Sequence, residues 1–200
     1  MKIMMDFIMH YLKKIKLNIF FALLMSLFFS SSIIAADNSL IIKTAEINNQ
    51  FEAYFLNADL ELSFNDDLDE AIRKGIPINF VIEFELKKPR KYWFDEDIAK
   101  KTKEIVLSYH ALSKQFILAE SENRLVAFDN LTQAKNELKK IKNWRIFDKS
   151  QIDDTDKYLA YLQVKLDQTK LPKQLQVDIT SNQEWQLVSK QFQWTFVNNK

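Results

Sequence analysis

The stretch that decides the fold is residues 54–64, which reads Tyr-Phe-Leu-Asn-Ala-Asp-Leu-Glu-Leu-Ser-Phe. Its apolar and polar side chains alternate, which is the pattern of an extended strand with one buried face. Residues 76–86 alternate in the same way. The two stretches therefore predict two half-buried strands that share a core. Their apolar faces carry Tyr54, Leu56, Ala58, Leu60, Leu62 and Phe64, and then Ile76, Ile78, Phe80, Ile82, Phe84 and Leu86.

A short helix is predicted between these two strands. Asn65 is the expected N-cap, aspartates follow in the first turn, and Arg73 and Lys74 suit the C-terminal end of the helix dipole. Gly75, the only glycine in the chain, falls where helices commonly end in a left-handed residue. The glycine thus has a structural explanation.

The rest of the chain continues the β-rich pattern. A second helix is predicted over Leu131–Ile141, with Asp129 or Asn130 as its cap. The apolar residues have odd numbers before Ser113 (Ile105, Leu107, Tyr109) and even numbers after it (Phe116, Leu118). We therefore expect a turn or bulge near Ser113. Further strands are predicted at about 39–48, 103–119, 123–128, 143–148, 158–166 and 175–179, with one bulged strand or two over 185–196.

These elements predict the fold class. Many strands with two short helices favour a mainly β (α+β) fold, an antiparallel β-sandwich-like domain, because too few helices are present to serve as parallel crossovers. We expect a single domain over residues 37–200, preceded by an N-terminal hydrophobic helix.

Residues 1–36 are typical of a targeting segment. Lysines at positions 13, 14 and 16 precede an uncharged stretch, residues 17–36, that ends in small residues. This pattern predicts a secretory signal peptide that is cleaved after Ala35 or Ala36. An uncleaved membrane anchor stays open, because about 20 apolar residues are enough to cross a bilayer. In either case the positive-inside rule predicts a periplasmic domain, free or anchored to the inner membrane.

Composition excludes several classes of function. Residues 1–36 contain four of the 28 basic residues and one of the 27 acidic ones, which leaves the exported part with a net charge of −2. A near-neutral surface disfavours nucleic acid as a partner. The chain has no cysteine, one glycine and two histidines, so thiol chemistry, glycine-rich phosphate loops and multi-histidine metal sites are excluded. We expect no cofactor.

Residues 89–97, Pro-Arg-Lys-Tyr-Trp-Phe-Asp-Glu-Asp, are the densest group of chemically versatile side chains. Tryptophan, tyrosine and arginine supply much of the binding energy at protein interfaces. The competing interpretation, which the pattern favours, is that Trp93 plugs the end of the sandwich while Arg90 pairs with a nearby carboxylate. The candidate partner-binding surface consists of Arg90, Lys91, Tyr92, Trp93 and Asp95.

Other candidate groups have structural explanations. On an extended strand His110 and Ser113 would point to opposite faces, about 10 Å apart, which disfavours a base–nucleophile pair. The acidic clusters at 66–70 and 153–156 lack the spacing of a calcium loop and are interpreted as a helix start and a solvated loop. The aromatic residues over 185–196 are expected to pack in the core. No catalytic or metal-binding residue is predicted.

Six stretches carry a resemblance to a known family: Ala71–Pro77, Arg90–Asp95, Leu107–Phe116, Phe128–Leu138, Leu166–Gln176 and Trp185–Trp194. In these stretches the chain resembles the DUF4390 family, exported proteins of unknown function found mainly in proteobacteria. It departs from the family pattern at Gln174, where a proline is expected, and at Phe192, where tryptophan is common. The resemblance implies no activity, but it suggests an accessory role beside a neighbouring sensor kinase.

These observations leave two functional hypotheses. The first is a non-enzymatic binding or accessory module of the envelope, with an envelope or inner-membrane protein, or a lipid, as its partner. The alternative is a carboxylate-based enzyme or ligand-binding protein that acts on an envelope component, because paired acids can catalyse without histidine or cysteine.

Overall fold

The computed structural model describes residues 39–121, 124–153, 156–173, 175 and 185–198. The signal peptide or anchor predicted over residues 1–36 lies outside the described residues, as does most of the strand predicted over 175–179. No helix within the described ranges has both the length and the apolar character needed to cross a membrane.

Two antiparallel sheets form the domain, as the sequence predicts. The smaller sheet has the order β1-β2-β7 and the larger the order β6-β5-β4-β3-β8-β9. The smaller sheet consists of β1 (Ser39–Gln50), β2 (Ala53–Ser63) and β7 (Lys140–Asp148). The larger sheet consists of β3 (Ile78–Lys88), β4 (Glu96–His110), β5 (Gln115–Glu120), β6 (Leu125–Phe128), β8 (Lys157–Leu166) and β9 (Phe192–Val197).

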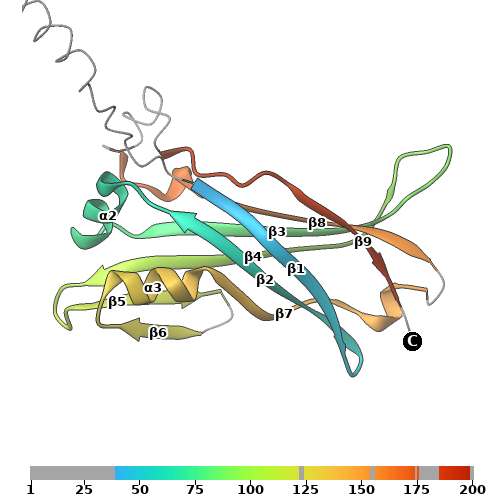
Figure 1. The fold of residues 1–200 in the computed structure, drawn as a ribbon, viewed down its shortest axis with the longest axis horizontal. Helices are drawn as coiled ribbons and strands as arrows, with labels where there is room; N and C mark the ends of the chain where they lie inside the picture. The colour runs from blue at the N-terminus through green and yellow to red at the C-terminus, as the bar shows by residue number, and fades with distance from the viewer. Residues whose placement is uncertain (1–38, 122–123, 154–155, 174, 176–184, 199–200) are drawn as a thin grey trace, which may run out of the picture. The chain divides into compact units, whose positions relative to one another are not determined.

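The smaller sheet and one helix together cover the larger sheet. Helix α2 (Asp66–Arg73) connects β2 to β3, and α3 (Leu131–Leu138) connects β6 to β7. Strand β1 packs against β8 and β7 against β4, whereas α3 packs against β5 and β6 (Figure 1). The result is a sandwich in which α3 extends the smaller layer.

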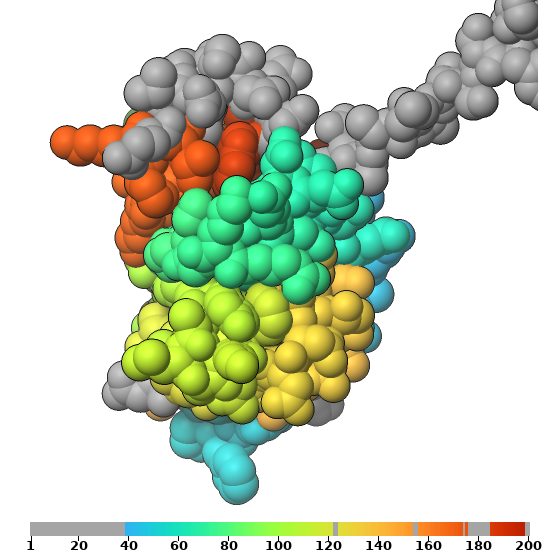
Figure 2. Space-filling model, turned by 90° about the vertical axis from the view of Figure 1, so that its left-hand side faces the viewer, coloured from blue at the N-terminus to red at the C-terminus, as the bar shows by residue number. Residues whose placement is uncertain are grey.

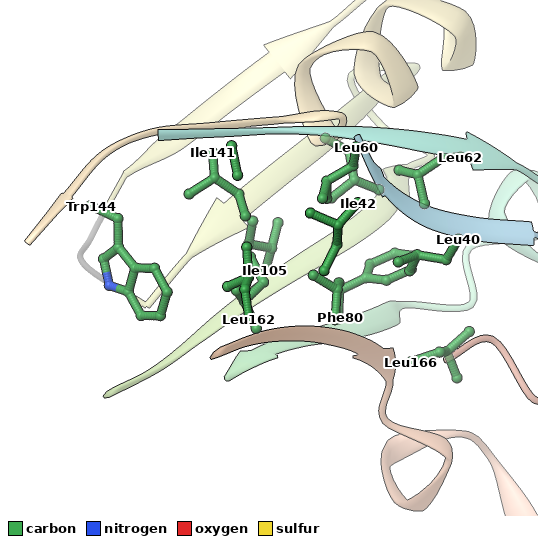
Figure 3. Packing of buried hydrophobic residues seen from close by; sticks show 14 of the residues in the cluster. Leu40, Ile42, Leu60, Leu62, Phe80, Ile105, Ile141, Trp144, Leu162 and Leu166 are labelled. Atoms are coloured by element: carbon green, nitrogen blue, oxygen red, sulfur yellow. The ribbon is translucent and has the colours of Figure 1, made fainter. Parts of the chain in front are cut away.

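The core lies between the two layers. Figure 3 shows Ile42, Leu60 and Ile141 of the smaller sheet pointing toward Phe80 and Leu162 of the larger one. Burial of one such side chain contributes about 1.5–3 kcal/mol to folding. The predicted inner faces are confirmed, apart from the partly exposed residue 76 that precedes β3. On the opposite face of β3, however, Asn79 and Val81 are buried as well, so the first half of this strand is covered on both faces. The predicted core residues that are buried are Tyr54, Leu56, Ala58, Leu60, Leu62, Phe64, Ile78, Phe80, Ile82, Phe84 and Leu86.

Both helices begin at the predicted caps. Asn65 Oδ1 accepts a hydrogen bond of 2.9 Å from the backbone N–H of Leu68, and Asn130 Oδ1 accepts one of 2.9 Å from Gln133. Gly75 follows α2 with φ +88°, in the left-handed region. These local predictions are confirmed because capping depends on residues close in sequence.

The second helix is shorter than predicted. It ends at Leu138, and Ile141 lies in β7 instead. The backbone N–H of Leu60 donates to the Lys139 carbonyl at 2.7 Å, so pairing with β2 takes over where the helix would have continued. Ile141 is nevertheless buried, which explains why helical spacing included it.

The stretch predicted as one strand over 103–119 is two strands. Strand β4 starts earlier, at Glu96, and a turn at residues 111–114 separates it from β5. The turn expected near Ser113 is confirmed. Near the C-terminus a single strand, β9, pairs with one end of β8, and Val188 makes an isolated bridge to Lys165 farther along β8. The strand predicted over 185–196 is therefore confirmed only from Phe192 onward, because residues 185–191 are not in a strand. Trp185 and Phe196 are buried, as expected of core residues.

The strand directions define two ends of the domain. Strand β3 runs from the end that holds α2 to the opposite end, where it turns into β4. At the α2 end, Lys135 Nζ of α3 lies 2.5 Å from Asp69 Oδ1 of α2 and 4.9 Å from the centroid of the Phe64 ring. Figure 2 shows α2, the β4–β5 region and α3 packed side by side at this end.

Candidate functional site

The β3–β4 hairpin carries the predicted binding residues. Its strands pair from Ile78 opposite Leu107 to Lys88 opposite Glu96, and residues 89–95 form the loop, here called the β3–β4 tip. The pairing of β8 with β3 ends at Lys87, and Figure 1 shows the tip projecting beyond the rest of the sheet. The tip is therefore held away from the body of the domain.

Three consecutive aromatic side chains of the tip face solvent. Tyr92 is 83% exposed, Trp93 80% and Phe94 93%. The interpretation of Trp93 as a plug for the sandwich is therefore wrong. The core at this end is filled instead by Tyr54, whose ring stacks on Phe147 at 4.7 Å between centroids and meets Phe196 at 5.5 Å. These residues come from distant parts of the chain, so the local sequence could not show that together they fill this end of the core.

Contacts at the base of the tip fix its start and end. The guanidinium of Arg90 pairs with Glu96, which confirms that Arg90 has a carboxylate partner. The backbone N–H of Arg90 also donates to Asp95 Oδ1 at 3.3 Å. Lys91 Nζ lies 5.4 Å from the centroid of the Tyr92 ring, in a cation–π contact, and has no carboxylate partner among the described residues. Lys91 is thus the cation beside the exposed rings.

The hairpin stem below the tip is lined by ion pairs. A hydrogen bond from Lys100 holds the pKa of Glu85 below its ordinary value, and the hydrogen bond to Glu85 raises the pKa of Lys87. Carboxylates on the stem are therefore neutralised by neighbouring lysines. The pairs are Lys87 with Glu85 and Asp97 (3.3 Å each), Lys100 with Glu85 (2.6 Å), and Lys88 with Asp153 (3.4 Å) and Asp156.

All five residues of the candidate surface lie in this one loop. Lys91, Tyr92 and Trp93 are exposed, while Arg90 and Asp95 hold the base together. The predicted set omits Phe94, which is the most exposed of the three rings. The sequence did contain a sign that Phe94 would be exposed. It is the last of three consecutive aromatic residues, and a strand that buries every second side chain cannot bury all three.

The His110–Ser113 pair departs from expectation. His110 Nδ1 and Ser113 Oγ are 3.0 Å apart, not on opposite faces of a strand, because β4 ends at His110 and the chain turns. The Ser113 backbone N–H also donates to this nitrogen at 3.4 Å. Both residues are exposed, and their contacts are those of a stabilised turn.

Four residues of the two acidic clusters pair with cationic side chains of the protein. Asp69 pairs with Lys135, Glu70 with Lys74 at 2.6 Å, and both Asp153 and Asp156 with Lys88, whereas residue 154 lies outside the described residues. Among the residues described, no group of three or more acidic or histidine side chains could hold a metal ion.

The described surface includes several hollows. One of about 520 Å³ lies between the start of β1 and residues 186–192, and one of about 540 Å³ between β4 and β7. A third, of about 220 Å³ on the smaller sheet, is lined by Glu46 and Asp59. Thr44 Oγ1 donates to Asp59 Oδ2 at 3.3 Å, so one of these two carboxylates is already hydrogen-bonded.

Comparison of the chain with known proteins identifies its family. Neither a curated protein nor a solved structure matches it. Residues 37–195, which hold the β3–β4 tip and both sheets except the last two residues of β9, match the family described as a domain of unknown function, DUF4390. The match spans most of the chain, and the protein therefore belongs to the DUF4390 family.

Proposed function

We propose that this protein is an exported, non-enzymatic binding module of the cell envelope that engages its partner through the β3–β4 tip. The observation that carries the proposal is the exposure of Tyr92, Trp93 and Phe94 on a projecting hairpin. Large exposed apolar groups that lie side by side are typical of interaction sites.

The energetics of the tip support a role in binding. Burial of one large apolar side chain contributes about 1.5–3 kcal/mol. Because the three rings stay in water, they do not add this free energy to folding. A partner that covers them would gain it as binding free energy. The ion pairs on the stem and the contacts of Arg90 keep the loop base in place. Less conformational entropy is therefore lost when the tip binds a partner.

Export is the second part of the proposal. It is supported by the lysines at positions 13, 14 and 16 and by the uncharged segment over residues 17–36 that follows them. Cells that produce the C-terminally tagged full chain can be separated into cytoplasm, periplasm and membrane. The chain is expected in the periplasm as a product starting at Ala36 or Asp37, or full-length in the membrane. A full-length cytoplasmic product contradicts export.

Binding through the tip can be tested in the same cells. A photoreactive benzophenone side chain replaces Phe94 in one variant and Leu112 in another. Leu112 is a matched control because it is 92% exposed and lies in the turn at the other end of β4. Illumination should give covalent adducts from position 94 well above those from position 112. Equal yields from the two positions contradict the proposal.

One observation favours the alternative function, a carboxylate-based enzyme or ligand-binding protein. Glu46 and Asp59 line the same hollow on the smaller sheet. A melting-temperature screen with soluble envelope glycan fragments tests it. A ligand of this hollow should raise the Tm of the wild-type protein and leave that of Glu46→Gln unchanged. No shift with any fragment disfavours the alternative.

A further inference from the structure

We infer that the partner of the β3–β4 tip is the surface of a lipid bilayer, with Tyr92, Trp93 and Phe94 inserted at the interface and Lys91 among the headgroups. This inference rests on the proposed function, since it names the partner of the same site. Three features of the tip support it: its shape, the distribution of charge around it, and its position in the domain.

The shape of the tip suits a bilayer better than a protein pocket. The tip is a seven-residue loop, residues 89–95, that projects past the last pairing of β3 with β8. A stable protein interface covers about 800 Å² on each partner and needs complementary surfaces. Three rings supply about 150–250 Å² each and are raised above their surroundings. A bilayer accepts a convex group without a matching pocket, and tryptophan and tyrosine are enriched at its interface.

The charges around the tip are sorted along the hairpin. Within the described part of the chain, Lys91 has only the Tyr92 ring against its ammonium group. Asp95 accepts a hydrogen bond from the Arg90 backbone, and Glu96 pairs with the Arg90 guanidinium. Farther down the stem, Glu85 and Asp97 are paired with lysines. The outermost charge is therefore positive, which matches anionic lipid headgroups.

The position of the tip allows it to reach a surface without steric obstruction. Because a strand rises about 3.3 Å per residue, the 15 residues of β4 separate the tip from the β4–β5 turn by about 50 Å. The rings can therefore enter an interface while the opposite end of the domain stays in water. Leu112, at that opposite end, has no aromatic neighbour within its turn.

The chemical identity of the photo-adduct tests the inference. Cells producing the full chain with benzophenone at position 94 are illuminated, and the purified chain is analysed by intact-mass spectrometry. We expect mass increases equal to phospholipids, several-fold more abundant than those from position 112. In the same chain, Tyr92→Ser with Trp93→Ser should lower the lipid adducts several-fold, and Lys91→Glu should lower those with anionic lipids most.

Each other outcome has a defined meaning. Adducts from position 94 that consist of protein overturn the bilayer as partner but leave the proposed binding function intact. Lipid adducts of equal yield at positions 94 and 112 reflect mere proximity to a membrane and overturn the inference. No adduct from position 94 contradicts the inference and the proposed function together. Unchanged melting of the tip variants shows that any loss of adduct comes from lost binding.

Discussion

The hydroxyl group of Tyr54 donates a hydrogen bond of 2.6 Å to Asn198 Oδ1, 144 residues away. Tyr54 lies in β2 of the smaller sheet, and Asn198 follows β9 at the edge of the larger one. The bond is buried and joins the two layers at the end of the sandwich from which the β3–β4 tip projects. The tyrosine ring also packs on Phe147 and Phe196, so one residue ties three strands together.

Removal of this hydroxyl group should weaken the join between the layers without disturbing the aromatic packing. Tyr54→Phe is expected to lower the free energy of unfolding by about 1 kcal/mol, because one buried hydrogen bond is lost. Tyr54→Ala should cost about 3–5 kcal/mol, because a cavity is added. Urea denaturation measures both values. Equal losses for the two variants would show that the hydroxyl, not the ring, dominates.

A second pair of residues explains why a lysine lies in the core layer. Lys103 in β4 is opposite Ile82, on the inner face, and is 4% exposed. Its ammonium group lies 2.6 Å from Glu120, which is opposite Ile105 on the same face. In Lys103→Met the carboxylate of Glu120 keeps only its ion pair with Arg124. The free energy of unfolding should fall by about 3–5 kcal/mol, because a buried ion pair is broken.

The double variant Lys103→Met with Glu120→Leu is the matched control. It removes both charges together, and Arg124 keeps its contact of 2.7 Å with Glu137. Replacing a whole buried pair by apolar residues is often neutral, so this variant should be closer to wild type than Lys103→Met. If the double variant is less stable than Lys103→Met, the destabilisation of the single variant does not come from the carboxylate of Glu120 losing its partner.

Sequence reasoning worked where the decisive contacts were local, and was incomplete where they were not. The caps at Asn65 and Asn130 and the left-handed Gly75 each depend on a few neighbouring residues, and each is confirmed. Whether Trp93 is buried depends on whether other residues, such as Phe147 and Phe196, already fill the end of the core. Only tertiary packing decides this. Lys103 has the parity of the core residues Ile105 and Leu107, but its partner Glu120 comes from the next strand.

Gly75 allows a test of the turn between α2 and β3. Its φ is +88°, and a Cβ added there would meet only the Tyr109 carbonyl oxygen, at an ordinary 3.7 Å. The cost of Gly75→Ala therefore comes from backbone strain rather than from a clash. We expect a loss of about 1–2 kcal/mol in thermal or urea unfolding. An unchanged Tm would show that the turn relaxes to a different conformation.

The aromatic residues of the tip should contribute little to the stability of the domain. Tyr92→Ser, Trp93→Ser and Phe94→Ser, singly or together, are expected to change the free energy of unfolding by no more than about 0.5 kcal/mol each, since these rings contact mainly solvent. Phe84→Ala, in the buried part of the same hairpin, should cost about 3–5 kcal/mol. A large loss from the tip variants would mean that the rings pack against the protein.

Glu137 should contribute to the stability of the domain at acid pH. The hydrogen bond from Arg124, helped by Lys142, holds the pKa of Glu137 below its ordinary value. Because the pKa is lower in the folded than in the unfolded state, this contribution is present above about pH 4.3, the unfolded value, and is lost as the pH falls through the folded value. Glu137→Gln should therefore be less stable than wild type at neutral pH, with the difference shrinking in acid. Urea unfolding at a series of pH values measures this convergence, and parallel stability curves for the two proteins would contradict it.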